Sequence, residues 1–541
     1  MNRKIAFIGA TALATLVIAG CGSVPTENNT VGQQAAATAA ATPSETWDFP
    51  FTKTQPLSKH KVTLTMYIPT NPNVSNYNNL EIFRNLERDT NVHIDWVGGN
   101  INTLIAGGNL PDAFVNAGFT PQQLAQYGED GAFISWNQYL KYMPNVQKIF
   151  QEYPSLKEIS TAPNGQIYSL PGGEGFGQGH TSIFADHHFL FINKKYLAEI
   201  HQPVPTTLAQ LHADLEAFKT KLGITYPMAY NEQAWAGDIA QLFGGFGLPD
   251  NNEHIVVRNG KVIFTATQPQ YKAAIDYFHT WFQQGLIDPE SLTENGNQYA
   301  AKEASGKLGA FIDWDETPAG QYQQNYTLVG PLTGPTGKKD VGFDNFYWAG
   351  PGAFVMTKSD PNPVLTAKWI NLVYAPYEAS QMHWGPAGTG TDDIFNLKHG
   401  ELVFSSFYKS LNNYGAYRPK VSVNMGVILP NWLNTYVQPE PRAELRLERI
   451  RNIFAPYMEK EHYPFGAVYF TPQENSELTT LQTNIDNYVN QYRATWLLKG
   501  GADEQWSNYV ATLEQMGLSQ YLNILQTALD RYVKSGGKLT E

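Results

Sequence analysis

The chain has a single cysteine, Cys21, among its 541 residues. With one thiol it can form no intrachain disulfide and no zinc site built from cysteines. Charged residues are also few, at 16% of the chain, against roughly 25% in an average soluble protein. The formal net charge of -12 argues against a nucleic acid or an anionic lipid surface as partner of the folded part. After the N-terminal segment, no apolar run is long enough to cross a bilayer.

Aromatic residues, in contrast, are abundant. The chain has 12 tryptophans, 30 tyrosines and 28 phenylalanines, a composition that excludes disorder of the whole chain. The hydrophobic share of 42% is enough for several cores, since a single core stops growing at roughly 250–300 residues. Length and composition therefore predict about two to four globular units.

The N-terminus has the pattern of a secretory signal. Arg3 and Lys4 precede an apolar run over residues 5–18, which is shorter than the roughly 20 residues that a membrane span needs. The run ends in Val17-Ile18-Ala19-Gly20-Cys21, which resembles a bacterial lipobox, in which the cysteine is lipidated and becomes the mature N-terminus. We expect a signal peptide over residues 1–20 and a lipid anchor on Cys21 at the extracellular face of the cell membrane. An ordinary signal with a chance cysteine is the alternative.

Residues 21–58 are dominated by small and polar residues and show no sustained apolar periodicity. Such a composition cannot build a core and predicts a flexible tether between the membrane and the folded body. An alanine-rich helix over part of this segment is the alternative.

The folded body opens with a repeated strand–helix pattern. Alternating apolar residues predict strands over 61–68 and 92–96, a short helix over 101–106 and a third strand over 110–115. A βαβαβ order predicts a mainly parallel sheet with helices on its faces.

The same alternation restarts at residues 188–193. A hydroxyl N-cap at Thr207 predicts the start of a helix, and another helix is expected over 271–282. Later strands are predicted over 307–312 and 353–356. Two α/β units in succession predict two lobes, and the apolar spacing after residue 478 predicts a helical C-terminal part.

Common catalytic motifs are missing. The chain contains no P-loop, no G-x-S-x-G elbow and no H-E-x-x-H sequence. The glycine-rich run at 172–179 fails the G-x-G-x-x-G spacing and predicts a flexible or close-approach loop. His180, His187 and His188 lack an acidic motif at ligand spacing, so we expect ordinary loop and strand histidines, and no metal.

Carboxylates gather at Asp313-Trp314-Asp315-Glu316. A glycosidase needs two carboxyl groups roughly 5–9.5 Å apart across a sugar, and adjacency in sequence does not establish that geometry. We therefore favour a binding role, because no second element of a catalytic set is identifiable. A glycan-cleaving enzyme anchored at the cell surface that uses Asp313, Asp315 or Glu316 is the alternative.

Several tryptophans lie in stretches rich in amides, acids and glycines. Indole faces can cover the C–H faces of a sugar, while carboxylates and amides pair with its hydroxyl groups. Taken alone, each tryptophan is more often a core residue. The predicted stacking residues are Trp235, Trp314, Trp348 and Trp384. The predicted polar partners are Glu174, Glu232, Asp315, Glu316 and Arg418.

Several segments, in order along the chain, carry a family resemblance. They are Asn-Leu-Pro-Asp-Ala-Phe at 109–114, Gly-Gln-Ile-Tyr-Ser-Leu-Pro at 165–171, the stretches 190–197 and 204–208, and the C-terminal stretches 499–509 and 517–532. With the lipobox-like Cys21, these segments resemble the family 1 extracellular solute-binding proteins that serve carbohydrate ABC importers. The similarity is greatest to the large lipoprotein branch that includes alginate-oligosaccharide binders.

The resemblance implies two α/β lobes of the periplasmic-binding-protein type, closing on a sugar, expected to be an oligosaccharide, without catalysis. It implies permease subunits of an ABC transporter as partners, a monomer and no cofactor. A peptide-like or other solute on the same scaffold is a further alternative. Each lobe is expected to be discontinuous, with 59–179 and 309–375 in the N-terminal lobe and 180–308 and 376–541 in the C-terminal lobe.

Members of this branch often carry a calcium loop between a Phe-Lys helix end and the next proline. The corresponding residues here, 218–227, contain no acid. We therefore predict no calcium at this position.

Overall fold

The computed structural model describes residues 56–177, 182–232, 234, 236–345, 348–388, 393–411 and 413–540. The predicted signal peptide, Cys21, nearly all of the predicted tether, His180 and Trp235 therefore lie outside the described residues. Within the described residues, no helix is both long and apolar enough to span a membrane.

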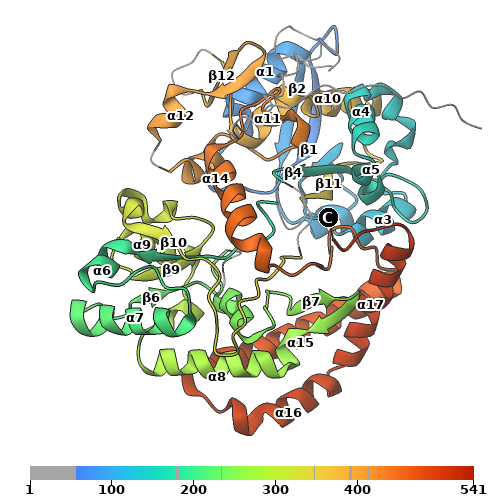
Figure 1. The fold of residues 1–541 in the computed structure, drawn as a ribbon. Coiled ribbons are helices and arrows are strands. Elements are labelled where there is room, and N and C mark those ends of the chain that lie inside the picture. The colour runs from blue at the N-terminus through green and yellow to red at the C-terminus, as the bar shows by residue number, and fades with distance from the viewer. Residues whose placement is uncertain are drawn as a thin grey trace, which may run out of the picture. The chain divides into compact units, whose positions relative to one another are not determined.

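The first lobe is built around a six-stranded sheet of order β14-β4-β11-β3-β1-β2 (Figure 1). Its strands are β1 Val62–Tyr67, β2 Val92–Val97, β3 Ala113–Val115, β4 Leu170–Glu174, β11 Ala349–Met356 and β14 Val427–Ile428, with a separate hairpin of β12 Phe395–Lys398 and β13 Glu401–Phe404. Its helices are α1 Glu81–Thr90, α2 Ile101–Ala106, α3 Pro121–Glu129, α4 Pro144–Glu152, α5 Pro154–Ser160, α10 Pro363–Val373, α11 Pro376–Trp384, α12 Ser406–Ser410 and α13 Tyr414–Tyr417.

Successive side chains of these strands enter different cores, as the period of two requires. Ala113 and Val115 lie in a large core that also holds residues of α1, α4, α10 and α11. Phe114 lies in a smaller core on the other face, with Leu124 of α3. Both faces of the sheet are therefore covered.

The second lobe holds a four-stranded sheet of order β10-β5-β9-β6. Its strands are β5 Phe189–Asn193, β6 Met228–Ala229, β9 Ala310–Asp313 and β10 Tyr326–Leu328, with a hairpin of β7 Ile255–Arg258 and β8 Lys261–Phe264. Its helices are α6 Lys194–Glu199, α7 Leu208–Leu222, α8 Pro269–Gln283 and α9 Gly296–Ala304, followed at the end of the chain by α15 Pro472–Lys499, α16 Ala502–Gln515 and α17 Leu518–Lys534.

The predicted two-lobed α/β class with a helical C-terminal part is confirmed, but the sheets are mixed, not mainly parallel. In the first lobe β1 runs parallel to β2 and β3, whereas β11 runs antiparallel to β3 and β4. In the second lobe β5 is antiparallel to both of its neighbours. Each exception involves a strand far along the chain from its partner, a pairing that local patterns do not encode.

The chain crosses between the two sheets after β4, after β10 and along α14, Pro441–Arg449. The first crossing lies between Glu174 at the end of β4 and Phe189 at the start of β5, and the boundary predicted at residue 180 falls outside the described residues and stays a prediction. The boundaries predicted at 309 and 376 are wrong, because β9 and β10 pair in the second sheet and β14 pairs in the first. A buried apolar strand such as β9 carries no local signal of the sheet that it joins.

The helix α14 lies between the two lobes in Figure 1 and continues directly into a π-helical turn, Ile450–Phe454. The helices α15–α17 pack on the second lobe through residues such as Ile485, Tyr509 and Leu525. A capping box of Thr471 and Glu474 starts α15, and Gly500 follows its last residue. These are signals that local sequence can encode.

Candidate functional site

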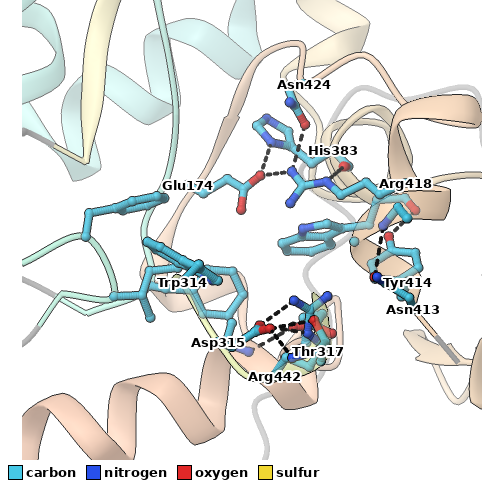
Figure 2. Close-up of a pocket in the computed structure, with 18 of the residues that line it drawn as sticks. Glu174, Trp314, Asp315, Thr317, His383, Asn413, Tyr414, Arg418, Asn424 and Arg442 are labelled. Atoms are coloured by element: carbon cyan, nitrogen blue, oxygen red, sulfur yellow. Dashed lines mark hydrogen bonds and ion pairs between the residues drawn. The ribbon is translucent and has the colours of Figure 1, made fainter. Parts of the chain in front are cut away.

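A pocket of about 590 Å³ lies between the two lobes. The residues that line it come from the end of β4, the start of β11, the 383–424 region of the first lobe, the end of β9 in the second lobe, and α14. Among the residues predicted from sequence, those that line it are Glu174, Trp314, Asp315, Trp348, Trp384 and Arg418. Figure 2 labels Glu174, Trp314, Asp315 and Arg418. These side chains, up to 244 residues apart in sequence, are brought together at one place.

Glu174 forms the polar wall of the first lobe. Its carboxylate accepts a hydrogen bond from the Arg418 guanidinium and lies 2.9 Å from Nδ1 of His383. Arg418 also donates to the carbonyl of His383 at 2.7 Å and to Oδ1 of Asn424 at 2.7 Å. Burial alone would raise the pKa of Glu174, but the charges of Arg418 and His383 outweigh it and lower the pKa to about 2. The carboxylate is therefore ionised over the physiological range.

Two glycines bring β4 close to its neighbours at this wall. A Cβ on Gly172 would stand 2.8 Å from Cβ of Ala353, and one on Gly173 would stand 2.2 Å from the carbonyl oxygen of Trp348. The start of the glycine-rich run is thus a place of close backbone approach, one of the two possibilities predicted for it.

Asp315 forms the matching wall of the second lobe. It accepts from Nε of Arg442 at 3.1 Å and from the backbone N–H of Thr317 at 2.9 Å. Burial would raise the pKa of Asp315, but Arg442 and Thr317 lower it below its ordinary value. Two carboxylate–arginine pairs therefore occupy separate sides of the pocket (Figure 2).

The predicted tryptophans differ in how much surface they offer. Trp314 is half-buried, with the rings of Phe184 and His187 each 5.8 Å from its own. Trp348 and Trp384 are only 5% and 1% exposed, so they offer little accessible surface to a ligand and belong to the core of the first lobe. Trp314 is therefore the only one of these three with an appreciable accessible surface.

Three arginines on one side of α14 contact the segment of Trp314. Arg442, Arg446 and Arg449 follow the i, i+4, i+7 spacing of a single helix face. Arg442 forms an ion pair with Asp315. The guanidinium carbon of Arg446 lies 3.4 Å from the centroid of the Trp314 ring. Arg449 makes two hydrogen bonds of 2.7 Å to Glu316. Sequence reasoning missed this helix, although the opposite charges of 313–316 and of the arginine row were a usable signal.

Asp313, beside this segment, also lines the pocket. Burial raises its pKa to about 7, while the carboxyl group of Glu303, which is close to it, has its own pKa raised further by burial and by the charge of Asp313. The two carboxyl groups therefore share at least one proton at neutral pH.

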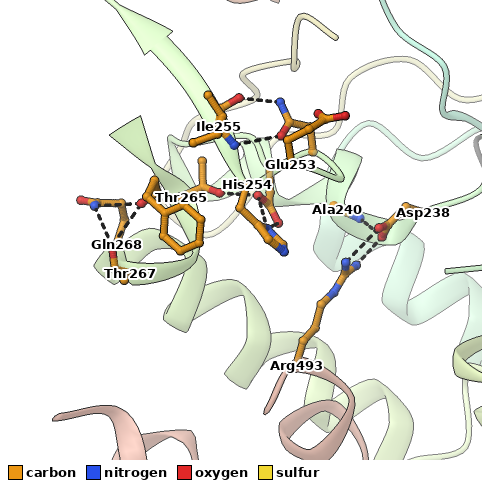
Figure 3. Close-up of polar contacts among 12 residues, drawn as sticks. Asp238, Ala240, Glu253, His254, Ile255, Thr265, Thr267, Gln268 and Arg493 are labelled. Carbon is orange, nitrogen blue, oxygen red and sulfur yellow. Dashed lines mark hydrogen bonds and ion pairs between the residues drawn. The ribbon is translucent and has the colours of Figure 1, made fainter. Parts of the chain in front are cut away.

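Two predicted site residues do not reach the pocket. Glu316 is engaged by Arg449. Glu232 is buried in the second lobe, where its carboxylate lies 3.5 Å from Nε of Arg493. Burial raises the pKa of Glu232 to about 7 against the charge of Arg493. Arg493 makes a closer pair with Asp238 (Figure 3).

The histidines of this region have structural partners. Nδ1 of His188 accepts from the backbone N–H groups of Gly237 and Asp238 at 3.0 and 3.2 Å. Nδ1 of His187 lies 3.1 Å from Asp344. Burial lowers the pKa of both histidines, to about 4 for His188, so both rings are neutral near pH 7.

A second cavity of about 830 Å³ lies between α3 and α5 of the first lobe and the segment 467–471 with α17. Tyr469 in its wall donates a hydrogen bond of 2.9 Å to the carbonyl of Ile159. None of the predicted site residues that the structure describes lines it. The smaller pocket holds the ion pairs and the accessible tryptophan, so we take it as the candidate binding site.

No group of three or more His, Cys, Asp or Glu residues suited to a metal is found among the described residues. At the calcium position considered above, α7 ends at Leu222 and Gly223 caps it in the left-handed conformation, with φ 73°. Lys219 and Lys221 are the charged residues of that turn. The absence of calcium there stays a prediction.

Comparison with known proteins gives a consistent picture. No protein-family model matches the chain. The fructooligosaccharide ABC transporter substrate-binding protein FusA of Streptococcus pneumoniae serotype 4 is 32% identical over 468 residues, which are 83% of this chain and 87% of FusA. The structure of FusA in complex with kestose is similar with a TM-score of 0.82 at 32% identity, over 87% of this chain and 100% of the FusA chain.

Two further relatives are more distant. A solute-binding protein of Bifidobacterium longum infantis, associated with an ABC transporter and described as binding HMO, has a TM-score of 0.74 at 22% identity, over 87% of this chain and 99% of its own, which is a likeness of fold. The lipoprotein LipO of Bacillus subtilis strain 168 is 26% identical over 281 residues, 46% of this chain and 51% of LipO.

Proposed function

The chain belongs to the substrate-binding proteins of ABC transporters, and we propose that it is a cell-surface receptor that binds an uncharged oligosaccharide between its two lobes. The pocket between the lobes, with an ion pair on each side and Trp314 in its wall, is the observation that carries this proposal. Delivery of the sugar to the permease subunits of an importer is part of the same proposal and is supported by the similarity to FusA. In this proposal the protein acts as a monomer, without catalysis, metal or cofactor.

The charges of the pocket favour an uncharged ligand. Arg418 and Arg442 line it, but each is already paired with a carboxylate, Glu174 or Asp315. Among the described residues that line the pocket, no further arginine is present to neutralise a uronate carboxylate. Paired carboxylates and guanidinium groups still offer acceptors and donors to sugar hydroxyl groups, which are themselves both donors and acceptors. The site is therefore better suited to neutral sugars than to alginate-like acidic ones.

Ligand binding is proposed to favour the closed arrangement of the lobes. A sugar held between Glu174 of the first lobe and Asp315 of the second touches both walls at once only when the lobes are together. A ligand shifts a conformational equilibrium by its difference in affinity for the two states. The importer then reads the closed form.

Kestose is the first ligand to test, because FusA was solved with it. At a concentration of 100 Kd, kestose is expected to stabilise the protein by about 2.7 kcal/mol, since it binds the folded state alone. Thermal denaturation and titration calorimetry would measure this. The panel includes a neutral milk trisaccharide, an alginate trisaccharide and a tripeptide, which test the other solute classes.

Matched variants distinguish the two cavities. Trp314→Ala is expected to weaken saccharide binding strongly without abolishing it, while Tyr469→Phe in the second cavity leaves it unchanged. Loss of binding in Tyr469→Phe but not in Trp314→Ala would show that the saccharide binds in the second cavity. If no saccharide of the panel changes the melting temperature of the wild-type protein, the proposal of a sugar receptor is wrong.

The glycan-cleaving alternative predicts product release during the same incubations. Asp315 and Glu316 are both held in arginine pairs, and the lowered pKa of Asp315 makes it a poor general acid. Chromatography of the incubated saccharides is expected to show no cleavage. Cleavage that is lost in Asp315→Asn would establish an enzyme in place of a receptor.

The lipobox-like segment before Cys21 and the similarity to the lipoprotein LipO support a lipid anchor. We propose that the mature protein begins at Cys21 and is held by its lipid at the extracellular face of the membrane, with residues 21–58 as the tether.

A further inference from the structure

Arg446 has an unusual position for a charged side chain. It is 2% exposed and lies on α14, where the chain crosses between the lobes for the third time. Within the part of the chain that the structure describes, no carboxylate forms a salt bridge with it, in contrast to Arg442 and Arg449 on the same helix.

Its guanidinium lies between two aromatic rings. The guanidinium carbon is 3.4 Å from the centroid of the Trp314 ring and 4.1 Å from that of Phe189. Phe189 is the first residue of β5 and stacks in turn on Phe454, at 4.6 Å and 8°. A guanidinium over a ring face is attractive, and more so when water is excluded. The Trp314 ring is therefore held through Arg446 against the buried start of β5.

The same guanidinium binds three backbone carbonyl groups. Its Nε donates to the carbonyl of Ile183 at 2.9 Å, and its terminal nitrogens donate to the carbonyls of Asp186 and Trp314. Ile183 and Asp186 belong to the chain between β4 and β5, where it first crosses between the lobes. One side chain thus links two crossings with the half-buried tryptophan of the pocket wall.

We propose that Arg446 is the positioning residue of the pocket: it holds the Trp314 ring in orientation and ties it to the crossing segments that connect the lobes. The consequence for ligands rests on the proposed function. A sugar that contacts Trp314 gains from a surface already fixed in place, which reduces the ordering cost of binding.

Only arginine satisfies these contacts. Its group is planar, so it can lie flat between two rings, and it carries five N–H donors in its plane for the carbonyl groups. Lysine keeps the charge but has neither the plane nor the fork of donors. Arg446→Lys therefore separates the geometry of the guanidinium from its charge.

The first experiment needs no ligand. The protein is labelled with 5-fluorotryptophan, and the Trp314 resonance is assigned by its loss in Trp314→Phe. In Arg446→Lys, this resonance is expected to shift and broaden while the other tryptophan resonances keep their positions, which shows that the fold is intact. Arg449→Lys, on the same helix face but against Glu316, is the matched control and is expected to leave it unchanged.

A second variant covers the case that Arg446→Lys does not fold. Phe189→Leu removes the ring on the other side of the guanidinium and keeps its three carbonyl acceptors. It is expected to move the Trp314 resonance in the same direction by a smaller amount. A Trp314 resonance that stays in place in every folded variant of this pair would overturn the proposal.

The second experiment is a double-mutant cycle with kestose. Arg446→Lys is expected to weaken kestose binding about tenfold when residue 314 is tryptophan, and by less than about twofold in the Trp314→Ala background, since coupled residues are not additive. Equal losses in both backgrounds would show that Arg446 does not act through Trp314. If the wild-type protein binds no kestose, the proposed function fails on this ligand, while the ligand-free resonance experiment still decides the positioning role.

Discussion

Glu174 is buried at the end of β4 and yet stays ionised. Its side chain is 13% exposed, and His383 and Arg418 both contact the same oxygen, Oε1. Burial penalises the charged form, but these neighbours stabilise it by more, so the pKa falls from 4.5 to about 2. A carboxylate with a lowered folded-state pKa stabilises the fold at pH values above its ordinary pKa and loses that contribution as the pH falls through the folded value.

Replacing the Glu174 carboxylate by an uncharged amide tests whether its charge stabilises the fold. Glu174→Gln is expected to lower the free energy of unfolding at pH 7 by about 3 kcal/mol, the equivalent of the pKa shift. The difference from wild type should persist at pH 5, fall to less than half at pH 3 and vanish below pH 2. Urea denaturation at these pH values measures it. Glu448→Gln, at an exposed position of α14, is the control and should stay within about 0.5 kcal/mol of wild type at each pH.

A difference between wild type and Glu174→Gln that does not depend on pH would show that the carboxylate acts by packing and not by charge. The ion pair with Arg418 would then need another explanation.

Residue types alone pointed to several of the residues that line this pocket. Glu174, Trp314, Asp315 and Arg418 stood out because acids, amides, glycines and tryptophans were close together in sequence, and the fold brings them to one pocket. Glu316 and Glu232 had the same local composition but are engaged elsewhere, by Arg449 and Arg493. Composition gives no information on which way a side chain points.

At the scale of elements, the helix ends follow local rules. Thr471 precedes α15 and accepts from the backbone N–H of Glu474 at 3.2 Å, while Glu474 accepts from the N–H of Thr471 at 2.7 Å. Glu474 also pairs with Arg531 of α17, so the cap fixes one helix and links it to another. Helix α14 does not follow from local rules in this way. The role of its three arginines depends on their contacts with residues 313–316, which lie over 120 residues earlier in the chain.

Removing the hydroxyl group of Thr471 tests how much the capping box of α15 contributes to stability. Thr471→Ala is expected to cost about 1 kcal/mol of stability, because it leaves the N–H of Glu474 without its acceptor. Denaturation midpoints measure the loss. Thr480→Ala, at an exposed position inside the same helix, should be neutral or slightly stabilising, since alanine is the better helix former. Equal losses in both variants would contradict a capping role.

At the scale of the whole molecule, the chain is proposed to combine an anchor, a tether and two lobes that are each discontinuous in sequence. Three crossings connect the lobes, and Arg446 joins two of them. The boundaries of the second and third crossings were misplaced from sequence, because β9 and β14 join sheets according to their long-range partners.

The anchor makes a prediction for the intact protein in cells. Cys21→Ser is expected to remove the lipid, so that the protein moves from the detergent phase to the aqueous phase in a Triton X-114 partition. Saccharide binding should be unchanged, because the folded body is the same. A wild-type protein already in the aqueous phase would show that residues 1–20 act as an ordinary secretory signal.

By itself, the sequence determined what depends on neighbours in the chain. The strands over 62–67 and 92–97, the helix that begins after Thr207 and the cap of α15 follow from periodicity and capping, which operate within a few residues. Short segments that follow one another in the order typical of the family also indicated the family, which the similarity to FusA confirms. Tertiary structure alone decided the direction and sheet of β9 and β11, the partners of Glu174 and Asp315, and the guanidinium held against Trp314. Those contacts join residues more than 100 positions apart, and their free energy comes from burial and charge pairing that exist only once the chain is folded.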